Sequence, residues 1–346
     1  MKRLFFAIAL VAVSCLSLSA YATDSQSDSS SKPEVPERQG WGDEFPLYGD
    51  VESVVVTTYQ LEEKLGEVVR GDIVDCAKYY FNKAGDVIER DKYNSYGSFR
   101  GKDVYKYDTS GNMIEGAGYN SDGSLFEKHT VKYDASGNWI EWVGYNSDGS
   151  LMEKYIGKYD ASGNMVELAR YWSDGSLDWK YIYKYDASGN MIEEAKYNSD
   201  GSLDVKRIYK YDASGNEIEW AEYNSDGSLD WKRIFKYDAS GNMIEKAYYN
   251  YDGRLVGKDI YKYDASGNKI EYAEYNSDGS LLCKEIYKYD TSGNMIEEAG
   301  YNYDGSLDEK LIYKYDASGN VIEKSKYYGE ALLPISQKVY EITYRK

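Results

Sequence analysis

Histidine and cysteine are almost missing from this 346-residue chain, which holds one histidine, His129, and three cysteines. Histidine is the usual general base near neutral pH and the commonest metal ligand, so a single copy argues against histidine-based catalysis and multi-histidine metal sites. Three cysteines are too few for a disulfide framework. We expect Cys76 and Cys283 to be free thiols on opposite faces of a sheet.

Long apolar runs are equally scarce, and the clearest one lies at the N-terminus. Lys2 and Arg3 precede an apolar run over residues 4–18, and Ala20-Tyr21-Ala22 then offers a small-x-small cleavage site. This pattern is typical of a secretory signal peptide, with Cys15 leaving a lipoprotein signal as the alternative. No later run predicts a transmembrane segment. We therefore expect cleavage near Ala22 and a protein that is secreted, periplasmic or attached at the cell surface.

Basic residues are outnumbered by acidic ones, 41 against 59, and the formal net charge is −18. A chain of this charge is repelled by nucleic acid and by anionic lipid surfaces. Neither is expected as a partner.

Tyrosine is the residue in excess, with 40 copies, and its spacing reveals a repeat. The tyrosine of a Lys-Tyr-Asp phrase recurs every 26 residues, and Phe81 stands in register in an earlier, more divergent copy, which makes ten copies. The nine regular positions are Tyr107, Tyr133, Tyr159, Tyr185, Tyr211, Tyr237, Tyr263, Tyr289 and Tyr315.

The repeat divides the chain into five expected parts. Residues 1–22 are the signal peptide, and the Ser-rich residues 23–40 are a disordered linker. Residues 41–80 form an N-terminal cap with a strand over 51–59, residues 81–328 are the β-hairpin repeats, and residues 329–346 are a C-terminal capping strand. Caps are expected because a repeat stack must cover its open ends.

Each copy contains two turn phrases, Asp-Ala-Ser-Gly-Asn and Asn-Ser-Asp-Gly-Ser. Both match a three-residue hairpin loop, in which a type I turn is followed by a left-handed glycine. The runs between them are rich in Tyr, Ile, Trp and Val and lack a helical period. The sequence therefore predicts an all-β fold, an antiparallel meander of about twenty strands.

Pairing the strands outward from these turns places Tyr211 opposite Glu217 and Glu193 opposite Arg207. One face then carries the tyrosines and alanines and is the candidate interior, whereas the other carries the repeated lysines. The register slips two residues every two strands, which makes a sheet coil. We expect a superhelical open sheet or solenoid.

The phrase Tyr-Lys-Tyr-Asp-Ala-Ser-Gly-Asn resembles the YD repeat of RHS-type bacterial proteins, and the Asn-Ser-Asp-Gly-Ser-Leu half resembles MORN-type hairpins. The resemblance covers about residues 79–328. It implies a β array, and YD repeats have been linked to carbohydrate binding. The chain departs from the family in its uniform period and in Asn after Gly. Only about 18 residues follow the array, so we do not expect a toxin domain.

Candidate chemistry is sparse. One Glu recurs in every copy, and ten equivalent positions favour a structural residue bonded to tyrosine hydroxyls or to cross-strand Arg207 and Arg233 over a glycosidase pair. Each turn holds one Asp with a backbone role, whereas calcium loops cluster several acids. His129 occupies a variable position and is expected at the surface or rim. No metal, cofactor or catalytic residue is predicted.

The informative variation is aromatic. The position after the recurring Glu changes in every copy, and Trp142, Trp220 and Tyr272 occupy it on the predicted lysine-rich face, where Tyr248 also points. Exposed aromatic rings on a rigid sheet stack on sugars or anchor protein interfaces, and packing across strands is the alternative. These four residues are the candidate ligand-binding residues. Trp179 and Trp231 are expected on the other face, in the core.

The leading hypothesis is an exported, non-enzymatic repeat scaffold that binds a polysaccharide or an extracellular or envelope protein through its β surface. The alternative is a structural or spacer component of the envelope or matrix without a small ligand. A glycan-acting enzyme is the distant alternative. The sequence leaves the ligand and the oligomeric state open.

Overall fold

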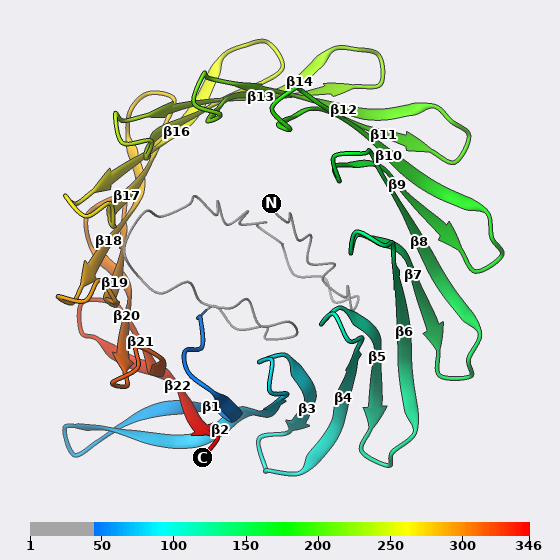
Figure 1. Ribbon diagram of the computed structural model, residues 1–346. Helices are drawn as coiled ribbons and strands as arrows, with labels where there is room; N and C mark the ends of the chain where they lie inside the picture. The colour runs from blue at the N-terminus through cyan, green and yellow to red at the C-terminus, as the bar shows by residue number, and fades with distance from the viewer. Residues whose placement is uncertain (1–44) are drawn as a thin grey trace. The chain divides into compact units, whose positions relative to one another are not determined.

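A computed structural model describes residues 45–346, and every regular element in this range is a β-strand (Figure 1). The predicted signal peptide and linker lie outside the described residues. The strands are β1 (Val51–Lys64), β2 (Glu67–Phe81), β3 (Val87–Tyr93), β4 (Phe99–Tyr107), β5 (Met113–Asn120), β6 (Leu125–Tyr133), β7 (Trp139–Asn146), β8 (Leu151–Tyr159), β9 (Met165–Trp172), β10 (Leu177–Tyr185), β11 (Met191–Asn198), β12 (Leu203–Tyr211), β13 (Glu217–Asn224), β14 (Leu229–Tyr237), β15 (Met243–Tyr249), β16 (Leu255–Tyr263), β17 (Lys269–Asn276), β18 (Leu281–Tyr289), β19 (Met295–Asn302), β20 (Leu307–Tyr315), β21 (Val321–Tyr328) and β22 (Leu333–Tyr344).

These strands form one antiparallel meander in which each pairs with the next, as the sequence predicts. The sheet is closed, which corrects the expectation of an open one, because β1 also pairs with β22 from Val51 opposite Tyr344 to Gln60 opposite Ser336. Closure removes the unpaired edges that an open sheet exposes. Residues 45–346 hold no helix of the length and apolarity needed to cross a membrane.

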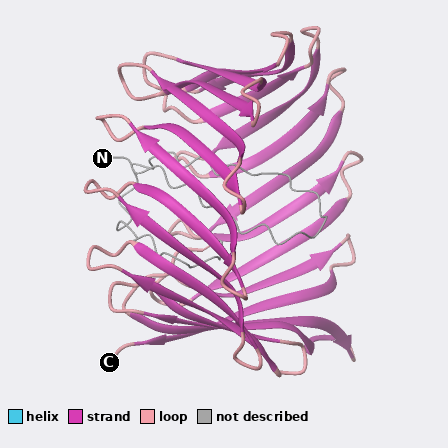
Figure 2. Ribbon diagram, turned by 90° about the vertical axis from the view of Figure 1, so that its right-hand side faces the viewer, coloured by secondary structure: helices cyan, strands magenta, loops and turns pink. Residues whose placement is uncertain are grey.

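The turns lie at the two ends of the strands (Figure 2) and have the predicted geometry. In the first turn Asp212 N–H donates to Asn216 O, Gly215 N–H donates to Asp212 O, and Gly215 has φ 86°. Glycine takes this left-handed conformation without strain. The Asp212 carboxylate accepts from the N–H of Ser214 at 2.8 Å and of Asn216 at 2.9 Å, which confirms its backbone role.

Beside each turn of the repeats, the strand that follows it contains one further bulge, which the turn sequences do not predict, and this bulge corrects the predicted register. Tyr211 does lie opposite Glu217, but the next pair is Lys210 with Glu219, so Ile218 is an extra residue. Asp204 is the extra residue after the other turn. An extra residue shifts all later pairs by one and so moves their side chains to the other face. Glu193 consequently lies opposite Ile208, not Arg207.

The repeated tyrosine joins one repeat to the previous one. Tyr185 at the end of β10 donates its hydroxyl proton to Met165 O, 20 residues earlier, at 2.8 Å. The other eight regular positions make the same bond, at 2.6 to 2.9 Å. Burial raises the pKa of Tyr289 to about 12, so this hydroxyl remains a donor at neutral pH.

The largest apolar core lies where the sheet closes. Val51, Val54 and Val87 are fully buried there, beside Tyr340 of β22. Asn320, also fully buried, accepts from Tyr48 N–H at 2.6 Å, and its Nδ2 donates to Tyr344 Oη at 2.6 Å. This amide therefore joins the segment before β1, the last repeat and the final strand.

Candidate functional site

The closed sheet has an inner and an outer face, and one contact identifies them. The segment that precedes β1 lies inside the circle of strands in Figure 1. Its Phe45 packs edge-on against the ring of Tyr313, with centroids 5.6 Å apart. Tyr313 pairs with Lys324, so these side chains, and their equivalents in every repeat, lie on the inner face.

The outer face is nearly the same in each repeat. Its centre is the recurring Glu, which binds the lysines of both neighbouring strands: Glu193 Oε1 lies 2.9 Å from Lys184 Nζ and Oε2 lies 3.0 Å from Lys206 Nζ. Equivalent double ion pairs form at Glu115, Glu141, Glu219, Glu271 and Glu297. The predicted arginine partners are therefore wrong, and the Lys–Glu–Lys ladder explains why this Glu recurs.

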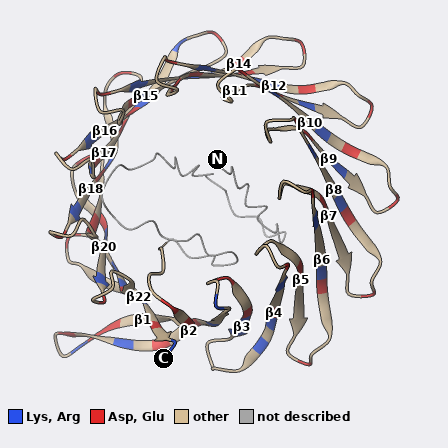
Figure 3. Cartoon of the chain, viewed as in Figure 1, with Lys and Arg blue, Asp and Glu red and all other residues tan. Residues whose placement is uncertain are grey.

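The inner face carries the side chains that differ between repeats. Four positions in each repeat point there and vary, and in the repeat at β11 and β12 they are Glu194, Lys196, Val205 and Arg207. The same four positions hold Trp220, Glu222, Trp231 and Arg233 in the next repeat. Acidic and basic positions are interspersed around the sheet (Figure 3), so neither sign gathers in one sector.

Aromatic rings form a continuous run on the inner face of β6 to β10. Trp142 contacts Tyr155 at 5.5 Å between centroids, Tyr155 contacts Trp179 at 6.0 Å, and Trp179 contacts Tyr181 at 5.2 Å. His129 and Tyr183 extend the run at its two ends. Burial raises the pKa of Tyr155 to about 12, which keeps this hydroxyl neutral. We call these six residues the aromatic run.

Arg170 borders the aromatic run. Its guanidinium lies 5.9 Å from the ring centroid of Tyr155 and forms ion pairs with Glu153 at 2.7 Å and Asp178 at 2.9 Å. Planar rings beside fixed charged groups can stack on an apolar sugar face and bond its hydroxyls.

A second cluster on β13 to β17 combines rings with buried charges. The Arg233 guanidinium lies 4.4 Å above the ring of Trp220, and Tyr248 donates its hydroxyl proton to Asp259 Oδ2 at 2.5 Å. Asp259 is buried, with 3% of its surface exposed. Arg233 Nε and Asp259 Oδ1 are buried without a hydrogen-bond partner among the described residues.

The four candidate ligand-binding residues all lie on the inner face, opposite to the face that carries the recurring lysines of the Lys–Glu–Lys ladder. Trp142 is buried, whereas Trp220, Tyr248 and Tyr272 are half-buried, so none is as exposed as the sequence predicts. The extra bulge is the reason for the change of face. Trp142 belongs to the aromatic run, whereas Trp220 and Tyr248 belong to the second cluster, which Tyr272 joins through its contact with Tyr261 at 5.4 Å between centroids.

Trp179 and Trp231 share this inner face with the candidates, which corrects their assignment to the opposite one. Trp231 pairs with Glu222, and Trp179 belongs to the aromatic run. His129 is 8% exposed, so its expected place at the surface or rim is also wrong. Sequence reasoning missed Tyr155 and Tyr181. The signal that could have found them is that this position varies between repeats: it holds tyrosine in these two and arginine, Arg207 and Arg233, in the next two.

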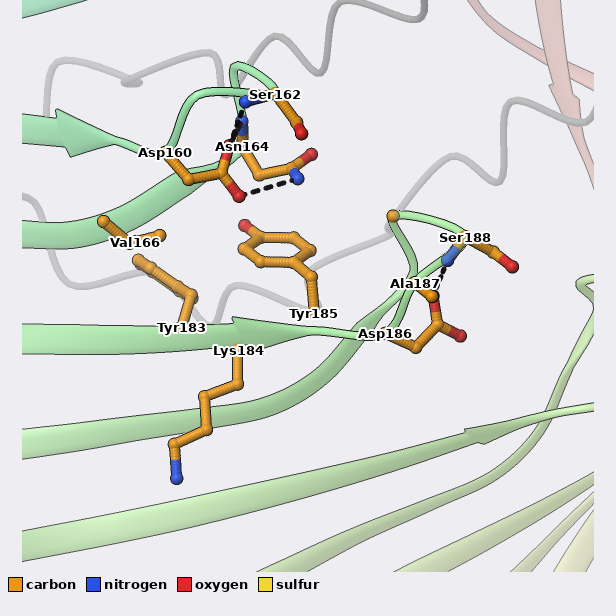
Figure 4. A pocket seen from close by; sticks show the side chains of 11 residues that line it. Asp160, Ser162, Asn164, Val166, Tyr183, Lys184, Tyr185, Asp186, Ala187 and Ser188 are labelled. Carbon is orange, nitrogen blue, oxygen red and sulfur yellow. Dashed lines mark hydrogen bonds between the residues drawn. The ribbon is translucent and has the colours of Figure 1, made fainter.

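A rim groove of about 520 Å³ lies between two successive Asp-Ala-Ser-Gly-Asn turns (Figure 4). Asp160 and Asn164 line one side and Tyr185 and Asp186 the other. Asp160 already accepts from Asn164, and Tyr185 donates to Met165 O. These polar groups already bond within the turn or between repeats, so we do not assign a ligand site to the groove.

The cysteines and acids of the described residues form no further site. Cys76 and Cys283 are free, as predicted, and their register places Cys76 on the outer and Cys283 on the inner face. No group of three or more His, Cys, Asp or Glu side chains in residues 45–346 is arranged to hold a metal ion.

Comparison with known proteins gives one family match, over residues 177–222, to a model described as a protein of unknown function, DUF2963. This segment is far less than half of the chain, and the model is not a YD-repeat model. No curated protein matches the chain.

Solved structures resemble the chain at low identity. The crystal structure of TcdB2-TccC3-Cdc42 is 12% identical, with a TM-score of 0.33 over 85% of this chain and 20% of that one. The Tc holotoxin pore of Photorhabdus luminescens is 11% identical, with a TM-score of 0.32 over 76% and 19%. A porin-like protein from Bacteroides uniformis is 9% identical, with a TM-score of 0.27 over 85% and 98%. The chain thus spans about a fifth of the first two.

Proposed function

We propose that residues 45–346 form a non-enzymatic scaffold whose inner face binds an extended ligand, with a polysaccharide as the first candidate and a protein segment as the second. The observation that carries this proposal is the separation of the two faces. The outer face repeats one ladder, whereas the inner face changes from repeat to repeat. Selection for a stable sheet alone would favour a repeated pattern on both faces.

The aromatic run favours a polysaccharide. Its rings follow one another over β6, β7, β8 and β10, so a chain of sugar rings could contact several of them in sequence. Arg170, Glu153 and Asp178 supply charged hydrogen-bonding groups beside it. The recurring Glu residues do not offer a catalytic pair, because their oxygens bind lysines on the outer face.

Glycan arrays and polysaccharide pull-down assays test this proposal. Trp179→Ala should weaken binding by up to about tenfold, since aromatic contacts contribute about 0.5–1.5 kcal/mol. Trp142→Ala tests the aromatic run and Trp220→Ala tests the second cluster, so comparing their binding shows which cluster contacts the ligand. Tyr251→Ala is the matched control, because Tyr251 is an aromatic residue at a turn with 71% of its surface exposed.

Two results would overturn the polysaccharide version. One is a wild-type protein that retains no polysaccharide, and the other is unchanged binding in all three tryptophan variants. Capture of one defined envelope protein, lost in the same variants, would support the second candidate ligand instead. Normal binding in Tyr251→Ala is required in either case.

The proposed location is outside the cytoplasm, on the evidence of the signal-peptide pattern in residues 1–22. Mass spectrometry of the exported protein tests it. A new N-terminus just after Ala22 supports the proposal, and recovery of the intact N-terminus only in the cytoplasm would contradict it.

A further inference from the structure

The β1–β2 hairpin extends beyond the closed sheet, as the light blue strands of Figure 1 show. β3 pairs with β2 only over residues 76–81, and β22 pairs with β1 only as far as Gln60. Residues 67–75 of β2 therefore lie beside β1 on one side, with Gly71, Asp72 and Val74 as extra residues at two register shifts, and beside no described strand on the other. This side of β2 is therefore a free strand edge, whereas closure of the sheet pairs the strand edges elsewhere.

The side chains along this free edge alternate regularly. Val68, Arg70, Asp72 and Val74 are exposed, and the residues between them are half-buried. The pairing with β1 is irregular near Tyr59, but this alternation continues from residue 68 to residue 74. The edge is thus an extended segment with two distinct faces.

The sequence of this segment, Val-Val-Arg-Gly-Asp-Ile-Val, is complementary to itself when read in the opposite direction. An antiparallel second copy with Gly71 opposite Gly71 places Val68 opposite Val74 and Arg70 opposite Asp72. Val69 then lies opposite Ile73. A twofold axis makes each of these pairs twice, which is the arrangement of a symmetric dimer interface.

The charges also select this register. A shift of two residues in one direction places Arg70 opposite Arg70, and in the other direction it places Asp72 opposite Asp72. Like charges directly opposite each other destabilise a strand pair, whereas opposite charges stabilise it. A shift of one residue would bring exposed side chains against half-buried ones.

Both charged side chains are exposed in this segment. Asp72 is exposed and forms no ion pair within residues 45–346. The Arg70 guanidinium lies over the ring of Tyr59, donates through Nε to Gln337 Oε1 and lies 3.6 Å from Glu323, yet its side chain is 47% exposed. Because a guanidinium has five N–H donors, a second carboxylate has room to bind it.

We propose that two copies of this chain associate through residues 68–74, with their β2 edges antiparallel about Gly71 and the two sheets joined into one. This interface is separate from the inner face and does not depend on the ligand proposed for it. Edge pairing of one short segment buries little surface, so the dissociation constant of the dimer should be on the order of 10 µM.

Sedimentation velocity over a range of concentrations tests the pairing by exchanging charges. Asp72→Arg places arginine opposite arginine and should weaken the dimer about tenfold or more. The double variant Arg70→Asp/Asp72→Arg restores the opposite charges and should restore the dimer. Asp230→Arg, at an exposed Asp of β14, is the control and should leave association unchanged.

Disulfide trapping tests the register itself. Opposed residues of an antiparallel pair have Cα atoms roughly 4.5–5.5 Å apart, within the range of a disulfide. In a Cys15→Ser/Cys76→Ser/Cys283→Ser background, Val68→Cys mixed with Val74→Cys should form a crosslinked dimer, and neither variant alone should. A protein that stays monomeric at every concentration, or crosslinking that is equal in the unmixed samples, would overturn the proposal.

Discussion

The imidazole of His129 stacks on the indole of Trp142, with ring centroids 5.5 Å apart and ring planes inclined by 21°. The contact joins neighbouring strands on the inner face and explains why the one histidine of the chain is buried there. Burial lowers the pKa of His129 below its ordinary value of 6.5, against the smaller opposing effects of Glu115 and Asp103. The buried ring is therefore neutral at pH 7.

Stability should depend on pH through His129. Below pH 6.5 the unfolded chain binds a proton that the folded chain binds only at lower pH, so the free energy of unfolding falls as pH drops from 6.5 towards the lowered pKa. Above pH 6.5 this contribution is fully present. In urea denaturation, the free energy of unfolding of the wild type should fall relative to that of His129→Phe as the pH drops below 6.5, because the variant lacks the titrating ring. Titration of the single histidine by NMR with an ordinary pKa would contradict the mechanism.

The tyrosine bond between repeats should have a measurable free energy. Tyr211→Phe removes the hydroxyl that donates to Met191 O at 2.8 Å and should cost about 1 kcal/mol in urea denaturation. Tyr251→Phe, at an exposed turn position, is the matched control and should cost nothing measurable. Equal losses in both variants would show that the hydroxyl does not act through this bond.

Closure of the sheet should be sensitive to Asn320. Asn320→Ala leaves Tyr48 N–H without its buried acceptor and should cost about 3 kcal/mol. Asn216→Ala removes the equivalent residue of an ordinary repeat, where the amide bonds only within its own turn, and should cost about 1 kcal/mol. Hydrogen exchange in β1 and β22 should rise in the first variant only. A similar cost in both would mean that the closing contacts are unimportant.

The two free thiols should be detectable by alkylation. Burial, followed by the nearby Glu274, raises the pKa of Cys283 above its ordinary value of 9.0, so its thiolate is rare at neutral pH. In a Cys76→Ser variant, iodoacetamide should modify Cys283 more slowly than it modifies free cysteine, and the rate should rise with pH. Unfolding in urea is the control and should abolish the difference.

The sequence predicts the turns and the meander because their signals are local. The glycine of each turn requires a left-handed conformation, and the 26-residue spacing repeats the pair of turns without interruption. The β1–β22 pairing has no such signal, because two unique segments nearly three hundred residues apart form it. An open sheet is therefore the natural expectation.

The faces could be predicted only by recognising the second bulge. By the 26-residue period, the predicted pairing of Glu193 with Arg207 also implies Glu245 opposite Asp259 and Glu271 opposite Glu285, and these like-charge pairs indicate an error of one residue. Shifting past Ile218 gives every recurring Glu a lysine partner instead. Pairing of opposite charges across strands therefore distinguishes the correct register from the one predicted from the turn sequences alone.

The constant outer ladder has an evolutionary consequence. Because most of the 26-residue units present the same lysines, glutamate and turns to their neighbours, these units make equivalent contacts wherever they stand in the array. Unequal recombination within such an array can permute, duplicate or remove units, and each event brings a new order of inner side chains into contact while the joins between units stay the same. The fold is in this sense a frame in which binding surfaces can be reassembled without redesigning the sheet.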